Sequence, residues 1–147
     1  MEEITYKYIN HENEFFKQVI DLRYKILVEP YSKIKKYEYD EIDPISFHFV
    51  ALDKGTVAGY SRMTNVSGQG EITNVVVNPH YINQGIGFKM MKSHISKAKE
   101  SNITLLYLHA RLETVDFYKK VGFECKDKIN VSKKSGLPLQ NMHLKLW

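Results

Sequence analysis

The sequence predicts an α+β fold in which one mixed, mostly antiparallel sheet carries helices on both faces. Three features of the 147 residues support this prediction. The spacing of apolar residues switches repeatedly between a strand period and a helix period. A strand–helix–strand unit spans residues 71–110, and a connection of that length favours a parallel strand pair. Segments separated by hairpin turns flank the unit and predict antiparallel pairs.

The N-terminal part is predicted to contain one strand and one amphipathic helix. Residues 5–9 alternate weakly and predict a strand. Apolar residues recur at helical spacing over residues 14–28, so this segment is predicted to be a helix. Asn13 is a suitable N-cap, and Pro30 lies just beyond the predicted end. Residues 31–44 are polar and aromatic, and we expect a loop with a short helix.

Three consecutive strands are predicted in the middle of the chain, at residues 47–52, 56–63 and 71–77. The turn signals Asp53-Lys54-Gly55 and Ser67-Gly68-Gln69-Gly70 separate them, so neighbouring strands are expected to pair in antiparallel fashion. Asn78-Pro79 ends the third strand, because proline cannot donate a hydrogen bond to a strand ladder.

The C-terminal part is predicted to contain helices at residues 85–99 and 114–121 and strands at residues 105–110, 123–131 and 140–147. The first of these helices carries apolar residues on one side and lysines on the other. Gly122 is the expected C-cap of the second helix. Cys125 follows Phe123 in a predicted strand, and we expect it to be a small core residue.

Composition favours one cytoplasmic domain covering residues 1–147. The chain has 43% hydrophobic residues, no apolar run long enough to span a membrane, and a polar N-terminus. A single cysteine excludes an internal disulfide and a cysteine-based zinc site. The net charge of +4 suggests an anionic partner, which could be a nucleic acid, a membrane surface or a phosphorylated small molecule. The basic residues are scattered, which argues against a nucleic-acid footprint.

The joint between a strand and a helix at residues 75–87 is a candidate anion-binding site. Gly85 and Gly87 lie at the start of the helix, where backbone N–H groups have no partner within the helix. Missing side chains there would let a phosphate approach these amides. The alternative is that the glycines serve only a tight turn or close packing. The chain lacks the phosphate motifs GxGxxG and GxxxxGK[ST], and no HxxxH pair for a metal occurs.

Four segments in a fixed order resemble one family. They are VVVNP at residues 75–79, GIG at 85–87, LYLHAR at 106–111 and FYKKVGF at 117–123. Together they resemble the GNAT superfamily of acyl-CoA-dependent N-acetyltransferases, and the resemblance extends from about residue 22 to residue 142. It implies an acyl-CoA N-acyltransferase-like fold, with acetyl-CoA lying in a V-shaped gap between the strand that ends at Val77 and the strand at residues 105–110.

The resemblance also implies roles for individual residues. Backbone groups of Val75, Val76 and Val77 would bind the pantetheine arm and polarise the thioester carbonyl. Tyr118 falls on the tyrosine that protonates the departing thiolate. The amides expected to hold the pyrophosphate are those of Asn83, Gln84, Gly85, Ile86 and Gly87.

The base that deprotonates the amine is expected to be Glu71, His109 or water. Glu71 takes the place of a catalytic glutamate in some members, and we expect it to share a strand face with Thr73, Val75 and Val77. The alternatives are a solvated carboxylate at Glu71 and a buried structural histidine at His109.

The chain departs from the family pattern at Ile82, where most members have arginine or glutamine, and at Asn83, where many have glycine. Loss of the residue 82 side chain removes one phosphate contact but no backbone amide. Leu139 replaces a histidine of one subgroup, and Arg111 replaces an asparagine found in many members. The acidic stretch at residues 38–43 would either line the acceptor side of the site or be a solvated loop.

The resulting hypothesis is an N-acetyltransferase that moves an acetyl group from acetyl-CoA to a primary amine of a small molecule or peptide. The amine would attack directly within a ternary complex, without a metal, a nucleic-acid partner or a membrane, and a homodimer is compatible with this activity. Part of the positive charge would serve the phosphates of CoA, at the start of the lysine-bearing helix. The alternatives are a catalytically silent CoA-binding sensor or scaffold and a nucleic-acid-binding domain.

Overall fold

The structure is a computed structural model that describes residues 3–31, 40–133 and 135–146. It confirms the predicted α+β class and the mixed, mostly antiparallel sheet, whose strand order is β1-β2-β3-β4-β5-β8-β6, with β7 paired to β8. Among the strands that the structure describes, β4 and β5 are the one parallel pair. The strands are β1 (Thr5–Ile9), β2 (Phe47–Asp53), β3 (Thr56–Val66), β4 (Gln69–Val77), β5 (Leu105–Arg111), β6 (Glu124–Cys125), β7 (Asn130–Val131) and β8 (Pro138–Lys145).

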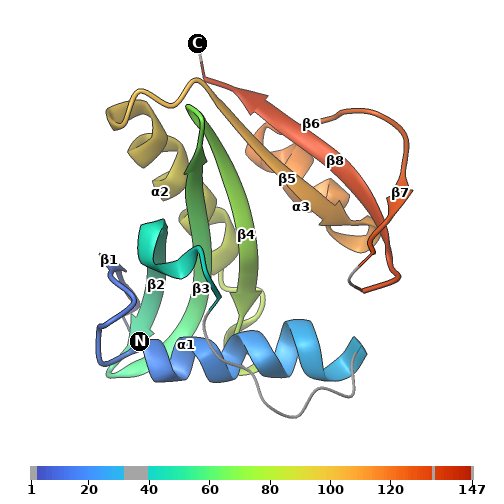
Figure 1. Ribbon diagram of the computed structural model, residues 1–147. Coiled ribbons are helices and arrows are strands. Elements are labelled where there is room, and N and C mark those ends of the chain that lie inside the picture. The colour runs from blue at the N-terminus through green and yellow to red at the C-terminus, as the bar shows by residue number, and fades with distance from the viewer. Residues whose placement is uncertain (1–2, 32–39, 134, 147) are drawn as a thin grey trace.

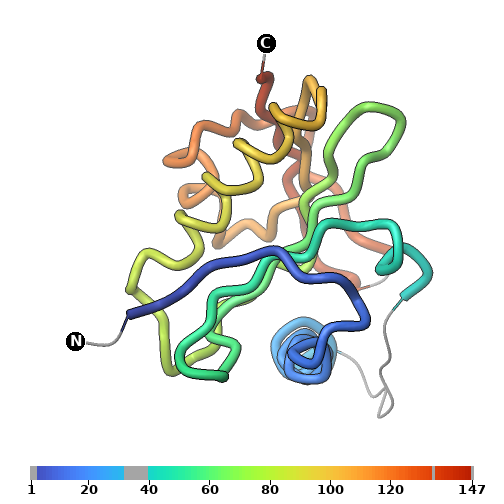
Figure 2. The backbone as a smooth tube through the Cα atoms, turned by 90° about the vertical axis from the view of Figure 1, so that its left-hand side faces the viewer, coloured from blue at the N-terminus to red at the C-terminus, as the bar shows by residue number. Residues whose placement is uncertain are grey.

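The helices α1 (Phe16–Arg23), α2 (Ile86–Glu100) and α3 (Val115–Val121) cover the sheet on both faces, as predicted. Figure 2 shows α1 almost end-on along one face and α2 on the opposite face. The core divides in the same way. One cluster packs α2 and α3 against the sheet, and a smaller one packs α1 against β2 and β3. None of the helices that the structure describes is both long enough and apolar enough to cross a membrane.

The first helix does not end where α1 ends. It continues as one turn of wider π-helix, Tyr24–Val28, and then as a 3-10 turn, Glu29–Tyr31. The predicted helix at residues 14–28 is confirmed, but it begins two residues later, at Phe16, and continues to Tyr31. The N-cap is Phe15 and not Asn13. The Asn13 side chain accepts a hydrogen bond from the Phe15 N–H at 2.9 Å. Turns of π-helix occur frequently at functional sites.

The predicted strand at residues 123–131 is wrong. Two separate two-residue strands, β6 and β7, replace it. The Lys126 N–H still donates to the Asn141 carbonyl of β8 at 2.8 Å, but the chain leaves the strand ladder at Asp127, which has a φ of 64°. The carbonyls of Lys126 and Asp127 accept from the side chain of Gln140 instead. Cys125 lies in the short strand β6 and is exposed, which corrects its expected place in the core.

A β-bulge at Asn74 reverses the alternation of side chains along β4, so that odd-numbered residues before and after it point to opposite faces of the sheet. Asn74 has a φ of 54°, and the pairing with β3 shifts between Tyr60 and Arg62. Side chains alternate along a strand, so one extra residue reverses the faces that follow it. Ile72 before the bulge and Val75 after it both pack on the α2 side.

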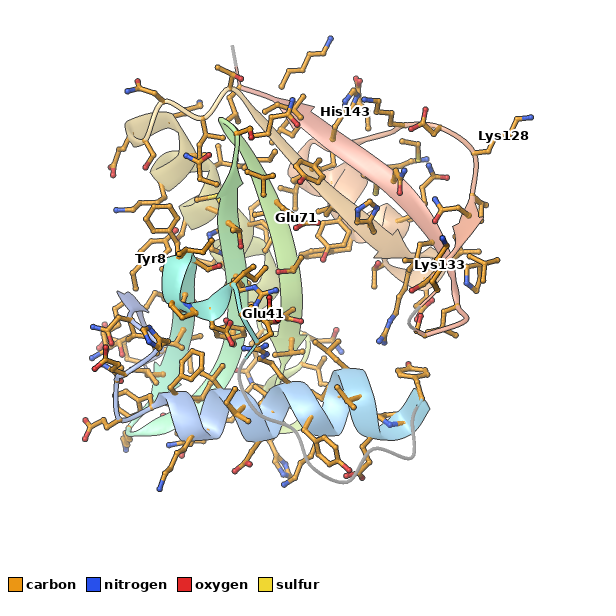
Figure 3. All side chains as sticks on the ribbon, viewed as in Figure 1. Tyr8, Glu41, Glu71, Lys128, Lys133 and His143 are labelled. Atoms are coloured by element: carbon orange, nitrogen blue, oxygen red, sulfur yellow. The ribbon has the colours of Figure 1, made fainter. Side chains whose placement is uncertain are left out.

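A buried ion-pair network joins α1 to the sheet. Arg23 Nη1 lies 3.1 Å from both carboxylate oxygens of Asp43, and both side chains are fully buried. Arg62 Nη1 lies 2.8 Å from Asp43 and from Asp40. Two acidic side chains of the stretch at residues 38–43, Asp40 and Asp43, are therefore paired with arginines, and Asp43 is the buried one of the two. Glu41 is exposed (Figure 3), and residues 38 and 39 lie outside the described part of the chain.

The network makes stability depend on pH. Burial opposes ionisation of Asp40, but its hydrogen bond to Arg62 and the charges of Arg62 and Arg23 outweigh burial and lower its pKa below the usual 3.8. A carboxylate with a depressed pKa stabilises the fold above its unfolded value, and this contribution is lost as the pH falls through the folded value. We expect Asp40→Asn to be less stable than wild type at pH 7 and the difference to shrink below pH 4. Urea unfolding across this range measures it, and a constant difference would contradict the assignment.

Candidate active site

Strands β4 and β5 separate along their length. They pair only where residues 69–71 meet residues 105–107, and beyond that point they diverge into the gap seen in Figure 1. A cavity of about 280 Å³ occupies this region, and we call it the gap cavity. Residues of the π turn after α1, of β4 and β5, of the 3-10 turn Leu112–Thr114 and of α3 line it, namely Ile26, Leu27, Ile72, Thr73, Asn74, Val75, Val76, Val77, Leu108, His109, Ala110, Arg111, Glu113, Thr114 and Tyr118.

A second cavity of about 450 Å³ lies beside the start of α2, and we call it the helix cavity. It meets the gap cavity at four shared residues: Val75, Val77, Thr114 and Tyr118. Its remaining lining residues are Tyr81, Ile82, Asn83, Gly85, Ile86, Gly87, Phe88 and Phe117. The two cavities are therefore neighbours, and Tyr118 lies at their junction.

The start of α2 presents uncapped backbone amides. The first N–H that bonds within the helix is that of Lys89, which donates to the Gly85 carbonyl at 3.1 Å, so the preceding amides have no helical partner. No side chain caps this end, and the first turn has no acidic residue. Gly85 has a φ of 77°, and an added Cβ would meet no atom within 4 Å. The helix dipole adds partial positive charge here, which suits a phosphate group.

The edge of β4 that faces β5 supplies further free backbone groups. Among the described residues, no strand pairs with β4 on this side from Ile72 to Val77. Unpaired N–H and C=O groups on an exposed strand edge bind an extended ligand readily. Val75 and Val77 line both cavities, and Val76 lines the gap cavity.

Tyr118 is buried, and its hydroxyl has no hydrogen-bond partner among the described residues. Burial raises the pKa of Tyr118 to about 12, so the phenol stays protonated at neutral pH. Its ring is fixed by edge contacts with the rings of Phe117 and Phe123, whose centroids lie 5.0 Å and 5.9 Å away. The site thus holds an uncommitted O–H donor at the junction of its two cavities.

Glu71 and His109, two candidates for the base, are brought together. Glu71 is the last β4 residue that pairs with β5 (Figure 3), and its Oε2 lies 3.8 Å from His109 Nε2. The His109 side chain is 45% exposed and lines the gap cavity, so it is not a buried structural histidine. Glu71 does not share a face with Val75 and Val77, because the bulge at Asn74 turns these valines to the other side.

The lysines of α2 do not line the helix cavity, and its lining contains no Lys or Arg. Lys89 Nζ lies 4.7 Å from the centroid of the Tyr6 ring, and Lys97 Nζ lies 5.5 Å from that of Tyr8. The polar groups that the start of α2 offers to an anion inside this cavity are therefore backbone amides, and the use of the helix's lysines for phosphates stays a prediction. Gln84 lines neither cavity.

Gly87 serves packing. A Cβ at Gly87 would lie 3.1 Å from Cζ of Phe117, a distance at which the ring must shift. Sequence reasoning did not identify Phe117 or Thr114 as lining residues, because contacts between α2 and α3 leave no local pattern. The bulge did leave a signal: asparagine is enriched at positive φ, and Asn74 follows the polar Thr73, which interrupts the alternation of polar and apolar residues along β4.

The contact between α2 and β3 yields a test of the helix cavity. A Cβ at Gly59 would lie 2.7 Å from Cγ2 of the buried Ile86, so we expect Gly59→Ala to displace the first turn of α2. Its cost is about 1–3 kcal/mol in stability, and we expect at least a tenfold loss of CoA affinity, about 1.4 kcal/mol.

Gly70→Ala is the matched control. Its Cβ would lie 2.6 Å from Leu106, a similar overlap at the paired end of β4, remote from α2's first turn. We expect this variant to lose stability but to keep CoA affinity. Calorimetric titration below the melting temperature of each variant compares them, and equal affinity losses would refute the role given to α2.

Comparison with known proteins agrees with this geometry. The family described as "Acetyltransferase (GNAT) family" matches residues 13–123. A Bacillus subtilis protein provisionally named a [ribosomal protein bS18]-alanine N-acetyltransferase is 25% identical over 118 residues, 78% of each chain. An acyl-CoA N-acyltransferase from Pseudomonas aeruginosa has a TM-score of 0.80 at 22% identity, over 96% of this chain and 99% of the other. An aminoglycoside 6'-N-acetyltransferase complexed with coenzyme A has a TM-score of 0.77 at 13% identity, over 97% of both.

The chain belongs to the GNAT acetyltransferase family. The solved structures share its fold, which confirms the predicted acyl-CoA N-acyltransferase-like architecture. The family and the names of the relatives define the class of the protein as an acyltransferase.

Proposed function

We propose that the protein transfers an acetyl group from acetyl-CoA to a primary amine by direct attack within a ternary complex. The observation that carries this proposal is the meeting of two cavities at Tyr118, Val75 and Val77. A donor in the helix cavity and an acceptor in the gap cavity could then react where the cavities join. Positioning of two bound reactants supplies a large part of such a rate acceleration.

The residues present fit a CoA molecule. The uncapped amides at the start of α2, together with the loop amides from Asn83 to Gly85, would hold its pyrophosphate. The free edge of β4 from Val75 to Val77 would bind the pantetheine arm and donate a backbone N–H to the thioester carbonyl. Acetyl-CoA supplies the activated acyl group, whose carbonyl carbon is open to attack by an amine.

Tyr118 is proposed as the general acid that protonates the CoA sulfur. Its hydroxyl is protonated at neutral pH and has no competing partner among the described residues, so it can donate to the sulfur as negative charge develops there. The proton on the incoming amine would be taken by Glu71, by His109 or by water, and the first two candidates lie 3.8 Å apart.

The acceptor is proposed to be a primary amine of a small molecule or a peptide. The gap cavity has apolar walls at Ile26 and Leu27 and polar groups at His109 and Glu113. The name of the Bacillus subtilis relative makes the N-terminal amine of a polypeptide one class to test.

A CoA-binding module without turnover is the alternative. It is favoured by Ile82, which is 59% exposed at the helix cavity and offers no charged contact to a phosphate. Release of free thiol from acetyl-CoA, measured with a panel of small amines and peptides that have a free N-terminus, distinguishes the two. We expect amine-dependent thiol release together with N-acetylated product. CoA binding without release on any amine would favour the silent module.

A further inference from the structure

Three polar side chains from three neighbouring strands form a chain across the sheet. His109 on β5 lies between Glu71 on β4 and Asn141 on β8. His109 Nδ1 is 2.6 Å from Asn141 Oδ1, and His109 Nε2 is 3.8 Å from Glu71 Oε2. His109 and Asn141 are direct cross-strand partners, so their side chains lie on the same face.

The contact with Asn141 decides which ring nitrogen carries the proton. An amide oxygen can only accept, so Nδ1 of His109 must be the donor in this hydrogen bond. Asn130 Nδ2 also donates to this oxygen, at 3.3 Å. In the neutral ring the lone pair is then on Nε2, the nitrogen next to Glu71. A neutral His109 therefore has its basic nitrogen available, and protonation there brings a positive charge beside a carboxylate.

Exposure separates the roles of His109 and Glu71. The Glu71 side chain is 23% exposed and does not line the gap cavity, whereas His109 lines it and is 45% exposed. His109 can thus contact an acceptor amine and afterwards pass a proton to water. The other charged groups that line this cavity are Arg111 and Glu113, whose charges are opposite.

We propose that His109 takes the proton from the acceptor amine, with Asn141 as its positioning residue and Glu71 as the carboxylate that stabilises the charged ring. An N–H bond of the ammonium breaks and an Nε2–H bond forms, which leaves a neutral amine and an imidazolium. The proton then leaves from Nε2 to solvent, and the neutral ring is restored. This proposal rests on the proposed acetyl transfer and assigns the proton acceptor that the transfer requires.

The tautomer of His109 can be measured without any activity. Long-range proton–nitrogen correlation NMR of the protein in the absence of substrate distinguishes the two neutral forms. We expect the form protonated on Nδ1 in the wild type, and a loss of this preference in Asn141→Leu. Protonation of the neutral ring on Nε2 in the wild type would overturn the positioning role of Asn141.

The pH profile of kcat/KM tests the chemistry. We expect His109→Gln to lower kcat by about 100-fold or more. Asn141→Asp keeps the acceptor and adds a charge that favours the protonated ring, so the ascending limb should move to higher pH. Glu71→Gln should move it to lower pH, and Asn141→Leu should lower kcat without a matching loss of CoA affinity. If the ascending limb of the pH profile is at the wild-type pH in both Asn141→Asp and Glu71→Gln, the roles of Asn141 and Glu71 are structural only.

His143 provides the matched control. His143 Nε2 lies 3.9 Å from Glu124 Oε2, close to the 3.8 Å between His109 and Glu71. His143 lines neither cavity and lies two residues beyond Asn141 on β8 (Figure 3). We expect His143→Gln to have wild-type kcat and pH dependence. Wild-type activity in His109→Gln would overturn this proposal and leave acetyl transfer intact, whereas transfer to no amine by the wild type would overturn both.

Discussion

Tyr118→Phe is expected to lower kcat for acetyl transfer by about 100- to 10,000-fold, because it removes a general acid from the junction of the two cavities. The hydroxyl has no hydrogen-bond partner among the described residues, so its loss should change neither the melting temperature nor the affinity for CoA appreciably. Steady-state thiol release, thermal unfolding and calorimetric titration measure these three quantities.

Tyr6→Phe is the control for this prediction. Tyr6 is on β1, where its ring lies under Lys89 and lines neither cavity, so its variant should retain wild-type kcat. A Tyr118→Phe enzyme with wild-type kcat would show that the sulfur is protonated by another group. Equal losses in kcat and in CoA affinity would show that the hydroxyl acts in binding.

Asp43→Asn is expected to lower the free energy of unfolding by about 3–5 kcal/mol, the cost of breaking a buried ion pair. Its carboxylate is fully buried between Arg23 and Arg62, and removal of its charge leaves the arginine charges poorly compensated. The same network holds α1 on the sheet, and the π turn that continues α1 lines the gap cavity. We therefore expect this variant to lose activity together with stability.

Asp40→Asn is the matched variant, because Asp40 contacts the same two arginines but its side chain is 44% exposed. Its loss should be about 1 kcal/mol or less, in the range of exposed ion pairs. Urea unfolding at pH 7 compares the two variants. Similar losses for both would contradict the view that burial makes the contact of Asp43 decisive.

Local patterns predicted most of the fold. The helical spacing at residues 14–28 and 85–99 and the turn signals at residues 53–55 and 67–70 produce the helices and hairpins that the structure contains. Strand β4 begins two residues earlier than predicted, at Gln69, because β3 is longer and the turn comprises only Ser67 and Gly68. Errors occurred where distant contacts decide, as at Lys126 and Asp127, whose carbonyls accept from the side chain of Gln140 in place of a regular strand pairing with β8.

The candidate site was predictable to the extent that it consists of backbone. The Val75–Val77 edge and the start of α2 follow from the order of strand, loop and glycines along the chain. The pairing of Glu71 with His109 depends on the register of two parallel strands, and the contact of His109 with Asn141 spans 32 residues. No local spacing in the sequence encodes either contact. The single extra residue at the Asn74 bulge reverses the strand faces. It therefore places Glu71 on the opposite face from Val75 and Val77, with which the sequence predicted it to share a face.

The central claim is that the helix cavity and the β4 edge bind a CoA-type donor. Calorimetric titration of the wild-type protein with CoA tests this claim most directly, because it requires neither the acceptor nor turnover. The structure predicts one CoA bound per chain and a loss of affinity in Gly59→Ala, with affinity retained in Gly70→Ala. Absence of binding at millimolar CoA would contradict the account.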